Sequence, residues 1–162
     1  MHKLSGSIKN EAEKFMHLAL EIAKKSTCTR SKCGTIIVSK SGVVIGVGYN
    51  SPPGNLDSKC RCKNSKDIYH KKVTDKTCCV HAEQRAIMDA LARHSDLIKG
   101  SKLYFIRLDE NNEKSFAGKP YCTICSKMAL DSGVAEFHLW HEDGITSYNT
   151  EEYNDLSYEY KE

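Results

Sequence analysis

A histidine, a glutamate and a pair of cysteines have the types and spacing of a catalytic metal centre. His81 and Glu83 lie two residues apart at the start of VHAEQRAIMDAL, and Cys122 and Cys125 follow about forty residues later. Imidazole and thiolate are preferred zinc ligands, and three protein ligands leave the fourth tetrahedral position open, as a catalytic zinc requires. The spacing therefore predicts a zinc ion held by His81, Cys122 and Cys125.

Both ligand groups are expected at the N-termini of helices. The apolar periodicity predicts helices over 81–93 and 122–132, the second of which ends at Gly133. Cysteines three residues apart are neighbours on a helix, and a helix N-terminus stabilises thiolates through its dipole and its free N–H groups. The two cysteines alone would also fit a redox pair, and it is His81 that favours a metal.

Glu83 is predicted to move protons beside the metal without ligating it. It follows His81 by two residues, about 200° around a helix, so the two side chains can meet only beyond the first turn. Zinc lowers the pKa of a bound water to about 7, and a carboxylate beside that water can accept its proton and pass it on. The simpler alternative is that Glu83 only interacts favourably with the helix dipole.

The elements that must position these residues alternate between helices and strands. A helix over 11–25 is followed by strands over 34–39 and 43–49, which the turn SKSG joins as a hairpin. Further strands are expected over 102–107 and 134–140. With the two helices above, the order is α-β-β-α-β-α-β, which predicts an α/β fold with a partly parallel sheet and helices packed on its faces.

Length and composition limit the class of protein. The 162 residues, 40% of them hydrophobic, fit one domain over 1–162 with its own core. No apolar run reaches the ~20 residues of a membrane span, and MHKLSGSIKN lacks the apolar centre of a signal peptide. We therefore expect a cytoplasmic protein whose eight cysteines are metal ligands or catalytic thiols rather than disulfides.

Charge is distributed unevenly along the chain. Residues 57–77 contain seven Lys or Arg against three Asp, and the acidic tail over 141–162 contains seven Asp or Glu against one Lys. The first segment belongs to a loop insertion over 57–80 that has little apolar content. Such a basic arm can bind phosphate or nucleic acid, although a solvated loop of mixed charge is the simpler interpretation.

These motifs resemble the signature of the zinc-dependent cytidine and deoxycytidylate deaminase superfamily, H-x-E followed by P-C-x-x-C. HAE and PYCTIC carry the resemblance, which extends over residues 8–140. It implies a three-layer α/β/α sandwich with a mixed central sheet, the zinc ligands predicted above, and Glu83 as proton shuttle. Tyr121 is a departure, because it separates Pro120 from Cys122, and we expect it to reshape the pocket wall that faces the base.

Within the superfamily the chain is most similar to deoxycytidylate deaminases, through STCTRSKCGTIIV, GVGYNSPPG and VHAEQRAI. This branch implies hydrolysis of the small molecule dCMP to dUMP by a homo-oligomer, with dCTP and dTTP as effectors and without nucleic acid or a membrane as partner. The implied substrate contacts are Asn50 on the sugar, Ala82, and Arg85 on a phosphate. A turn residue and an exposed surface arginine are the alternatives for Asn50 and Arg85.

The resemblance also implies a second, structural zinc, because some deoxycytidylate deaminases carry one in the corresponding loop. Its implied ligands are Cys28, Cys60, His70 and Cys79, with Cys62 and Cys78 as alternatives. Such a metal would order a loop that has little else to bury. The alternative is that these residues are ordinary reduced cysteines.

Two other functions fit the same residues. One is a deaminase of another cytosine substrate: a free nucleoside, a modified dCMP or a base in nucleic acid. Tight, salt-sensitive binding to single strands would identify the nucleic-acid version. The other is a zinc-binding module without catalysis, in which a further cysteine such as Cys78 closes the site. Four protein ligands at the His81 centre would identify that module.

Overall fold

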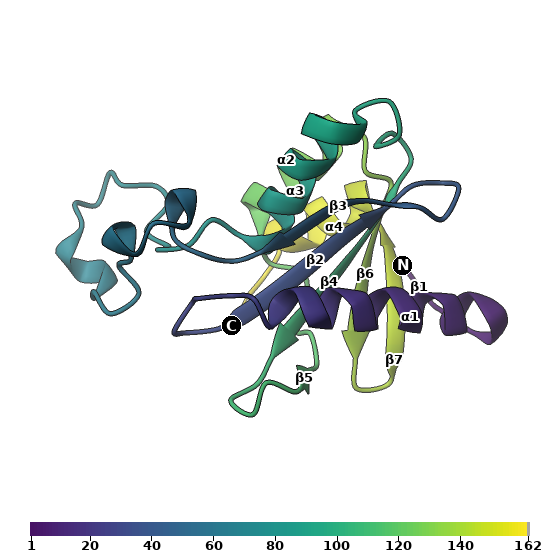
Figure 1. Cartoon of the computed structure of the whole chain (residues 1–162), viewed down its shortest axis with the longest axis horizontal. Helices are drawn as coiled ribbons and strands as arrows, with labels where there is room; N and C mark the ends of the chain where they lie inside the picture. The colour runs from purple at the N-terminus through teal and green to yellow at the C-terminus, as the bar shows by residue number, and fades with distance from the viewer. Residues whose placement is uncertain (162) are drawn as a thin grey trace.

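The computed structural model describes residues 1–161 and contains a mixed seven-stranded sheet with helices on both faces (Figure 1). Its strands are β1 (His2–Lys3), β2 (Lys32–Val38), β3 (Val44–Tyr49), β4 (Lys102–Leu108), β5 (Lys114–Ser115), β6 (Glu136–His141) and β7 (Gly144–Asn149). The order across the sheet is β1-β7-β6-β4-β2-β3, with β5 paired to β4. Strands β4 and β6 are parallel, and the other pairs are antiparallel. The predicted mixed sheet and the β2–β3 hairpin are confirmed.

Helix α1 (Gly6–Ala23) covers one face of the sheet, and α2 (Ala82–His94), α3 (Thr123–Ser132) and α4 (Thr150–Tyr158) cover the other. The alternation along β4 shows why two cores form. Leu103 packs with the α2–α4 layer, and its neighbour Tyr104 packs with α1. The predicted α/β/α sandwich is therefore confirmed. None of the helices within residues 1–161 is long and apolar enough to cross a bilayer.

The first helix begins earlier than its apolar pattern indicates. The prediction placed its start near Glu11, whereas α1 starts at Gly6 with Ser5 as the N-cap residue. Residues 6–8 and 10 are exposed and residue 9 is only half-buried. A turn without a buried side leaves no periodic signal in the sequence, which explains the missed boundary.

The segment expected as an acidic tail is part of the fold. Residues 144–158 form β7 and α4, and Tyr148 and Tyr153 are buried in the core. The ring of Tyr153 stacks on Phe137 of β6, with 4.0 Å between the ring centroids. The prediction of a tail was wrong because the numerous carboxylates masked two buried tyrosines, Tyr148 of β7 and Tyr153 of α4.

Close packing of α2 on β3 depends on glycine. A Cβ atom added at Gly48 would lie against the Ala82 carbonyl oxygen and 2.5 Å from the Ala86 backbone nitrogen. We expect Gly48→Ala to lower the free energy of unfolding by about 1–3 kcal/mol, because the strand and the helix would have to separate. Urea denaturation measures this change. Gly118→Ala is the matched control, since nothing lies within 4 Å of a Cβ at Gly118, and an equal loss there would contradict the packing argument.

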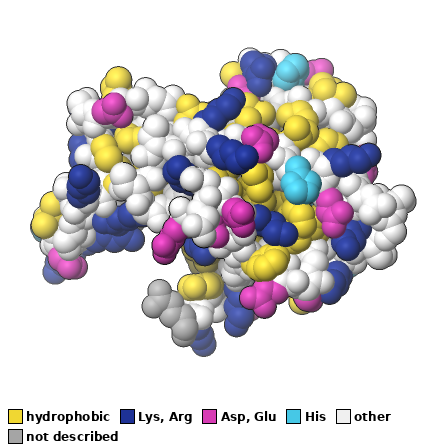
Figure 2. Space-filling model, turned by 60° about the horizontal axis from the view of Figure 1, so that its bottom comes forward, with side chains coloured by type: hydrophobic (Ala, Val, Ile, Leu, Met, Phe, Trp, Pro, Cys, Tyr) yellow, Lys and Arg dark blue, Asp and Glu magenta, His cyan; other side chains and the backbone are white. Residues whose placement is uncertain are grey.

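The long segment between β3 and α2 projects from the sheet as a lobe, residues 51–80 (Figure 1). It contains three short 3₁₀ turns, Pro53–Asn55, Asp57–Lys59 and Lys66–Ile68, and none of them buries a residue. Figure 2 shows Lys and Arg side chains gathered on this part of the surface. The lobe therefore depends for its order on something other than an apolar core.

Candidate active site

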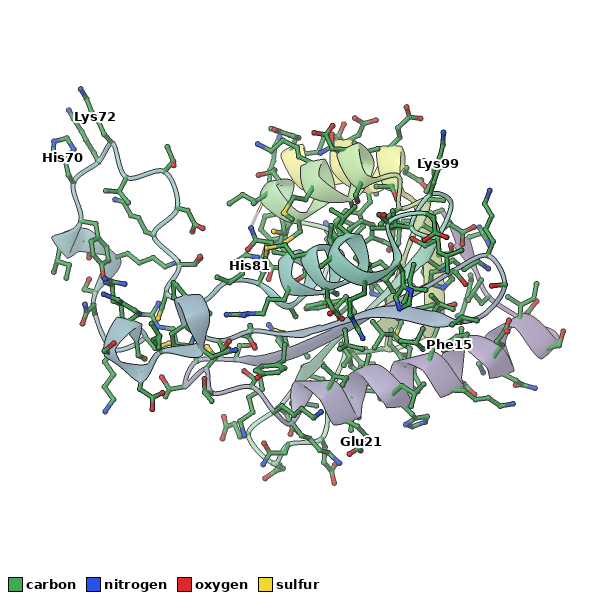
Figure 3. The ribbon with its side chains drawn as sticks, turned by 45° about the horizontal axis from the view of Figure 1, so that its top comes forward. Phe15, Glu21, His70, Lys72, His81 and Lys99 are labelled. Atoms are coloured by element: carbon green, nitrogen blue, oxygen red, sulfur yellow. The ribbon has the colours of Figure 1, made fainter. Side chains whose placement is uncertain are left out.

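The structure brings the three predicted zinc ligands together. His81 Nδ1 lies 3.2 Å from Cys125 Sγ and 3.3 Å from Cys122 Sγ, and the two sulfur atoms are 2.8 Å apart. His81 is the N-cap residue of α2 and Cys122 that of α3, so the N-termini of two helices meet at this point. Figure 3 shows His81 beside the sulfur atoms at the start of α3. The group can therefore hold one metal ion.

Local hydrogen bonds fix the ligands in place. The backbone N–H of His81 donates to Oε1 of Gln84 at 2.9 Å, which closes a capping box at the start of α2. The backbone N–H of Cys125 donates to Cys122 Sγ at 3.3 Å, which caps α3. Both contacts join residues three positions apart in sequence. Each motif therefore fixes the conformation of its own metal ligands.

The electrostatics of the centre favour a thiolate. The pKa of Cys122 is lowered to about 5, chiefly by the hydrogen bond from Cys125 and then by His81. The pKa of His81 is raised to about 9, chiefly by its hydrogen bond to Cys122. The same hydrogen bond raises the pKa of Cys125, so the shifts favour one thiolate, at Cys122. The donor set of two sulfurs and one imidazole fits zinc by its chemistry.

Glu83 lies in the first turn of α2 and is 6% exposed. Burial raises its pKa to about 7, and the charge of Cys122 contributes in the same direction. A carboxyl group whose pKa is near neutrality can both accept and return a proton at physiological pH. Its position beside the three ligands suits the proton transfer predicted from the sequence.

The centre opens into a pocket. Its lining includes Ala82, Phe105 and Tyr121 as well as Glu83, together with Asn50, Arg30 and Lys66, so one pocket joins the candidate metal centre to two basic side chains. Tyr121, the extra residue before the Cys-x-x-Cys pair, is 57% exposed. Its ring lies 5.8 Å from that of Tyr160, which follows α4.

Asn50 braces the wall of this pocket. Its Oδ1 accepts from Ser26 Oγ at 2.6 Å and from the Cys33 backbone N–H at 2.8 Å, and its Nδ2 donates to the Ser31 carbonyl at 2.7 Å. These bonds hold the loop between α1 and β2 against the end of β3. An amide nitrogen carries two hydrogens, so Asn50 keeps one for a ligand.

Arg85 lies outside this pocket, contrary to the expected phosphate contact. Its guanidinium donates to the carbonyls of Pro52 at 2.9 Å and Ser51 at 3.4 Å. It borders a separate groove beside Tyr49 and Met88. The side of α2 that carries Arg85 is turned toward the outer edge of β3, so Arg85 stabilises the start of the lobe.

Five of the six remaining cysteines form a cluster where the lobe meets the pocket, and Cys33 is not part of it. Cys28, Cys62 and Cys79 have their sulfur atoms within 4.8 Å of one another, and so do Cys60, Cys62 and Cys78. Cys62 Sγ lies 3.9 Å from Cys28 Sγ and 3.7 Å from Cys79 Sγ. With Zn–S bonds of ~2.3 Å, two ligands of a tetrahedral zinc are about 3.8 Å apart. The spacing of this cysteine cluster, Cys28, Cys62 and Cys79 with Cys60 and Cys78 beside them, therefore fits zinc.

His70 does not join the cysteine cluster. It is exposed near the tip of the lobe, beside Lys72 and far from His81 (Figure 3). Its Nδ1 accepts a hydrogen bond from the Lys72 backbone N–H at 3.1 Å. Cys62, considered only as a substitute from the sequence, lies instead at the centre of the cluster.

Sequence reasoning did not single out Arg30, Cys33 or Phe105, all of which line the pocket. Lys66, which also lines it, belongs to the basic arm over 57–77 that was expected to be able to bind phosphate. Arg30 and Cys33 lie in STCTRSKCGTIIV, a stretch that carries the family resemblance. The resemblance of that stretch could therefore have identified Arg30 and Cys33 as pocket residues. The sequence around Phe105 gives no such indication, because Phe105 has the pattern of an ordinary strand residue.

Comparisons with known proteins agree with this site. Residues 9–140 match the family described as "Cytidine and deoxycytidylate deaminase zinc-binding region". Deoxycytidylate deaminase of Mycobacterium phage D29 is 30% identical over 128 residues, 75% of this chain and 88% of that protein. The human deoxycytidylate deaminase is 27% identical over 129 residues, 76% of this chain. The chain spans 61% of the length of that human relative.

Solved structures show the same fold. The crystal structure of dCMP deaminase from the cyanophage S-TIM5 in apo form has a TM-score of 0.56 and 28% identity, covering 83% of this chain and 82% of its own. The same enzyme in complex with dCMP and dUMP has a TM-score of 0.55 and 27% identity, covering 83% and 81%. Cytidine deaminase from Burkholderia pseudomallei, 15% identical with a TM-score of 0.57, shares the fold over 87% of this chain and 94% of its own.

Proposed function

Because this chain belongs to the cytidine and deoxycytidylate deaminase family, we propose that it is a zinc-dependent hydrolase that converts dCMP to dUMP. The observation that carries the proposal is Glu83, buried beside a three-ligand centre. Within residues 1–161 the metal-binding group at this point comprises His81, Cys122 and Cys125. Three protein ligands leave one zinc position for a reactant, whereas a purely structural site is closed by four.

The chain's own residues divide the chemistry between them. His81, Cys122 and Cys125 would hold a zinc ion, which would supply Lewis-acid activation of a water molecule. Glu83 accepts a proton from that water as its oxygen adds at C4 of the cytosine ring. Glu83 then delivers this proton to N3. It next takes the remaining proton from the new hydroxyl at C4 and passes it to the departing amino group, so that the C4–N bond breaks, the C4 carbonyl forms, water is consumed and ammonia is released. Burial raises the pKa of the Glu83 carboxyl above its ordinary value, and a carboxyl group shifted in this direction is suited to returning a proton as well as accepting one.

A nucleotide substrate is supported by the basic side chains that line the pocket. Among the described residues that line it, the Lys and Arg side chains are Arg30 and Lys66, and Glu83 is the carboxylate. A nucleotide whose base lies near Glu83 would therefore place its 5′-phosphate against Arg30 or Lys66. The second N–H of the Asn50 amide is available for a sugar hydroxyl. In this proposal Arg30 and Lys66 bind the phosphate, in place of Arg85.

A second zinc in the cysteine cluster is the other part of the proposal. The support is the 3.7–3.9 Å spacing of Cys62 Sγ from the sulfur atoms of Cys79 and Cys28, together with the burial of all three residues. This site would serve structure, since it lies at the base of the lobe and holds together segments that are far apart in sequence.

A substrate panel tests the reaction. We expect dCMP to have the highest kcat/KM among dCMP, dCTP, deoxycytidine, cytidine, CMP and single-stranded oligonucleotides, measured by ammonia release. Deoxycytidine lacks the phosphate, so its kcat/KM should be roughly 10²-fold lower than that of dCMP. Equal kcat/KM for deoxycytidine and dCMP would contradict the phosphate assignment. Reaction of oligonucleotides alone would make the lobe in Figure 2 a nucleic-acid surface.

A further inference from the structure

Arg30 is held in the pocket wall by the lobe. Its Nε donates to the Cys62 carbonyl at 2.6 Å and its Nη2 donates to the Asn64 carbonyl at 2.8 Å. Both acceptors are backbone atoms more than thirty residues away in sequence. A guanidinium has five N–H groups, so these two bonds orient the planar fork and leave three N–H groups for an anion in the pocket.

The position of those carbonyls depends on the cysteine cluster. In the described stretch from Pro53 to Cys78, Cys62 is the residue that is buried, with 3% exposure. Its buried neighbours are Cys28 and Cys79, and these three form a separate core of their own. A segment with so few buried apolar contacts opens easily. The sulfur contacts of Cys62 are therefore what keeps its carbonyl beside Arg30.

The loop from Ser26 to Cys33, which contains Arg30, is also hydrogen-bonded to Asn50. The Cys28 backbone N–H donates to Ser26 Oγ at 3.2 Å, and that hydroxyl lies 2.6 Å from both Asn50 Oδ1 and the Asn50 carbonyl oxygen. The loop from Ser26 to Cys33 is thus fixed by the cysteine cluster on one side and by the end of β3 on the other. Arg30 lies between these two anchors.

We propose that Arg30 is the residue that selects the 5′-monophosphate, and that Cys62 is a positioning residue that acts through it. The inference rests on the proposed function and adds that the cysteine cluster sets substrate specificity. A planar fork can meet a phosphate with two parallel hydrogen bonds. Two backbone anchors reduce the side-chain freedom that phosphate binding would otherwise remove, so the oriented arginine binds more tightly than a free one.

Ligand affinity, measured on the zinc-loaded protein by calorimetry, tests this inference without requiring turnover. The probes are dUMP and deoxyuridine, which differ only in the phosphate. Arg30→Gln should weaken dUMP binding roughly 10- to 100-fold, the range for losing hydrogen bonds to a charged group. Deoxyuridine binding should be unchanged. Arg30→Lys should have a dUMP affinity between those of the unsubstituted protein and Arg30→Gln, because lysine keeps the charge but lacks the planar guanidinium.

Cys62→Ser tests the positioning role. It should reduce the preference for dUMP over deoxyuridine while the zinc at His81 is retained, as metal analysis would show. If Cys62 acts through Arg30, adding Arg30→Gln to Cys62→Ser should weaken dUMP binding by less than Arg30→Gln does alone. Lys71→Gln is the matched control, because Lys71 is an exposed cation of the same lobe that does not line the pocket.

Three results would overturn the inference. These are equal weakening of both ligands by Arg30→Gln, an unchanged dUMP preference in Cys62→Ser, and independent effects of the two substitutions. Failure of the proposed function would look different, since the unsubstituted protein would then release no ammonia from dCMP in the substrate panel.

Discussion

Glu83→Gln is expected to abolish deamination while leaving zinc bound. The substitution keeps the size of the buried side chain but removes the group that accepts and returns protons. Proton transfer by a positioned side chain contributes roughly 10²–10⁴-fold to rate, and Glu83 would serve two transfers, so we expect a loss at or beyond the upper end of that range. Ammonia release measures turnover, and metal analysis of the same sample measures zinc.

Two comparisons make this result specific. His81→Ala should lose both zinc and activity, because His81 is one of the three ligands. Glu110→Gln should lose neither, because Glu110 is exposed and does not line the pocket. Near-normal turnover by Glu83→Gln would rule out Glu83 as the proton shuttle. Loss of zinc from that variant would instead make Glu83 a ligand.

Cys62→Ser is expected to have the largest effect on the order of the lobe. The unsubstituted protein should contain two zinc ions per chain, and this variant one, because Cys62 is shared by both cysteine groups. The lobe has little other buried surface, so its opening should become roughly 100-fold more frequent, about 3 kcal/mol. Trypsin cleavage within residues 51–80, which are rich in Lys and Arg, measures that opening.

The control is His70→Ala. His70 was an expected ligand from the family resemblance, but its exposed position near the tip of the lobe predicts no change in zinc content or cleavage rate. Release of one zinc by His70→Ala would restore the ligand set expected from the sequence. A single zinc in the folded, unsubstituted protein would instead make the cysteine cluster a group of ordinary thiols.

The sequence alone determined the elements whose pattern is short-range. His81 and Glu83 begin one helix, Cys122 and Cys125 cap another, and the β2–β3 hairpin follows from alternation and a turn. In each case the interacting atoms are within a few residues of one another. Helical and strand periodicity then fix their relative positions without reference to the rest of the chain. The order of these elements was enough to predict the layered fold.

Only the tertiary structure decided which side chains reach the pocket and the cysteine cluster. Arg85 is excluded because the side of α2 that carries it is turned toward β3, while Arg30 is brought in by carbonyls of a distant lobe. In the same way, Cys62 is buried whereas Cys60, two residues earlier, is exposed. An irregular segment has no period from which burial can be read, so the direction of these side chains depends on contacts between residues far apart in sequence.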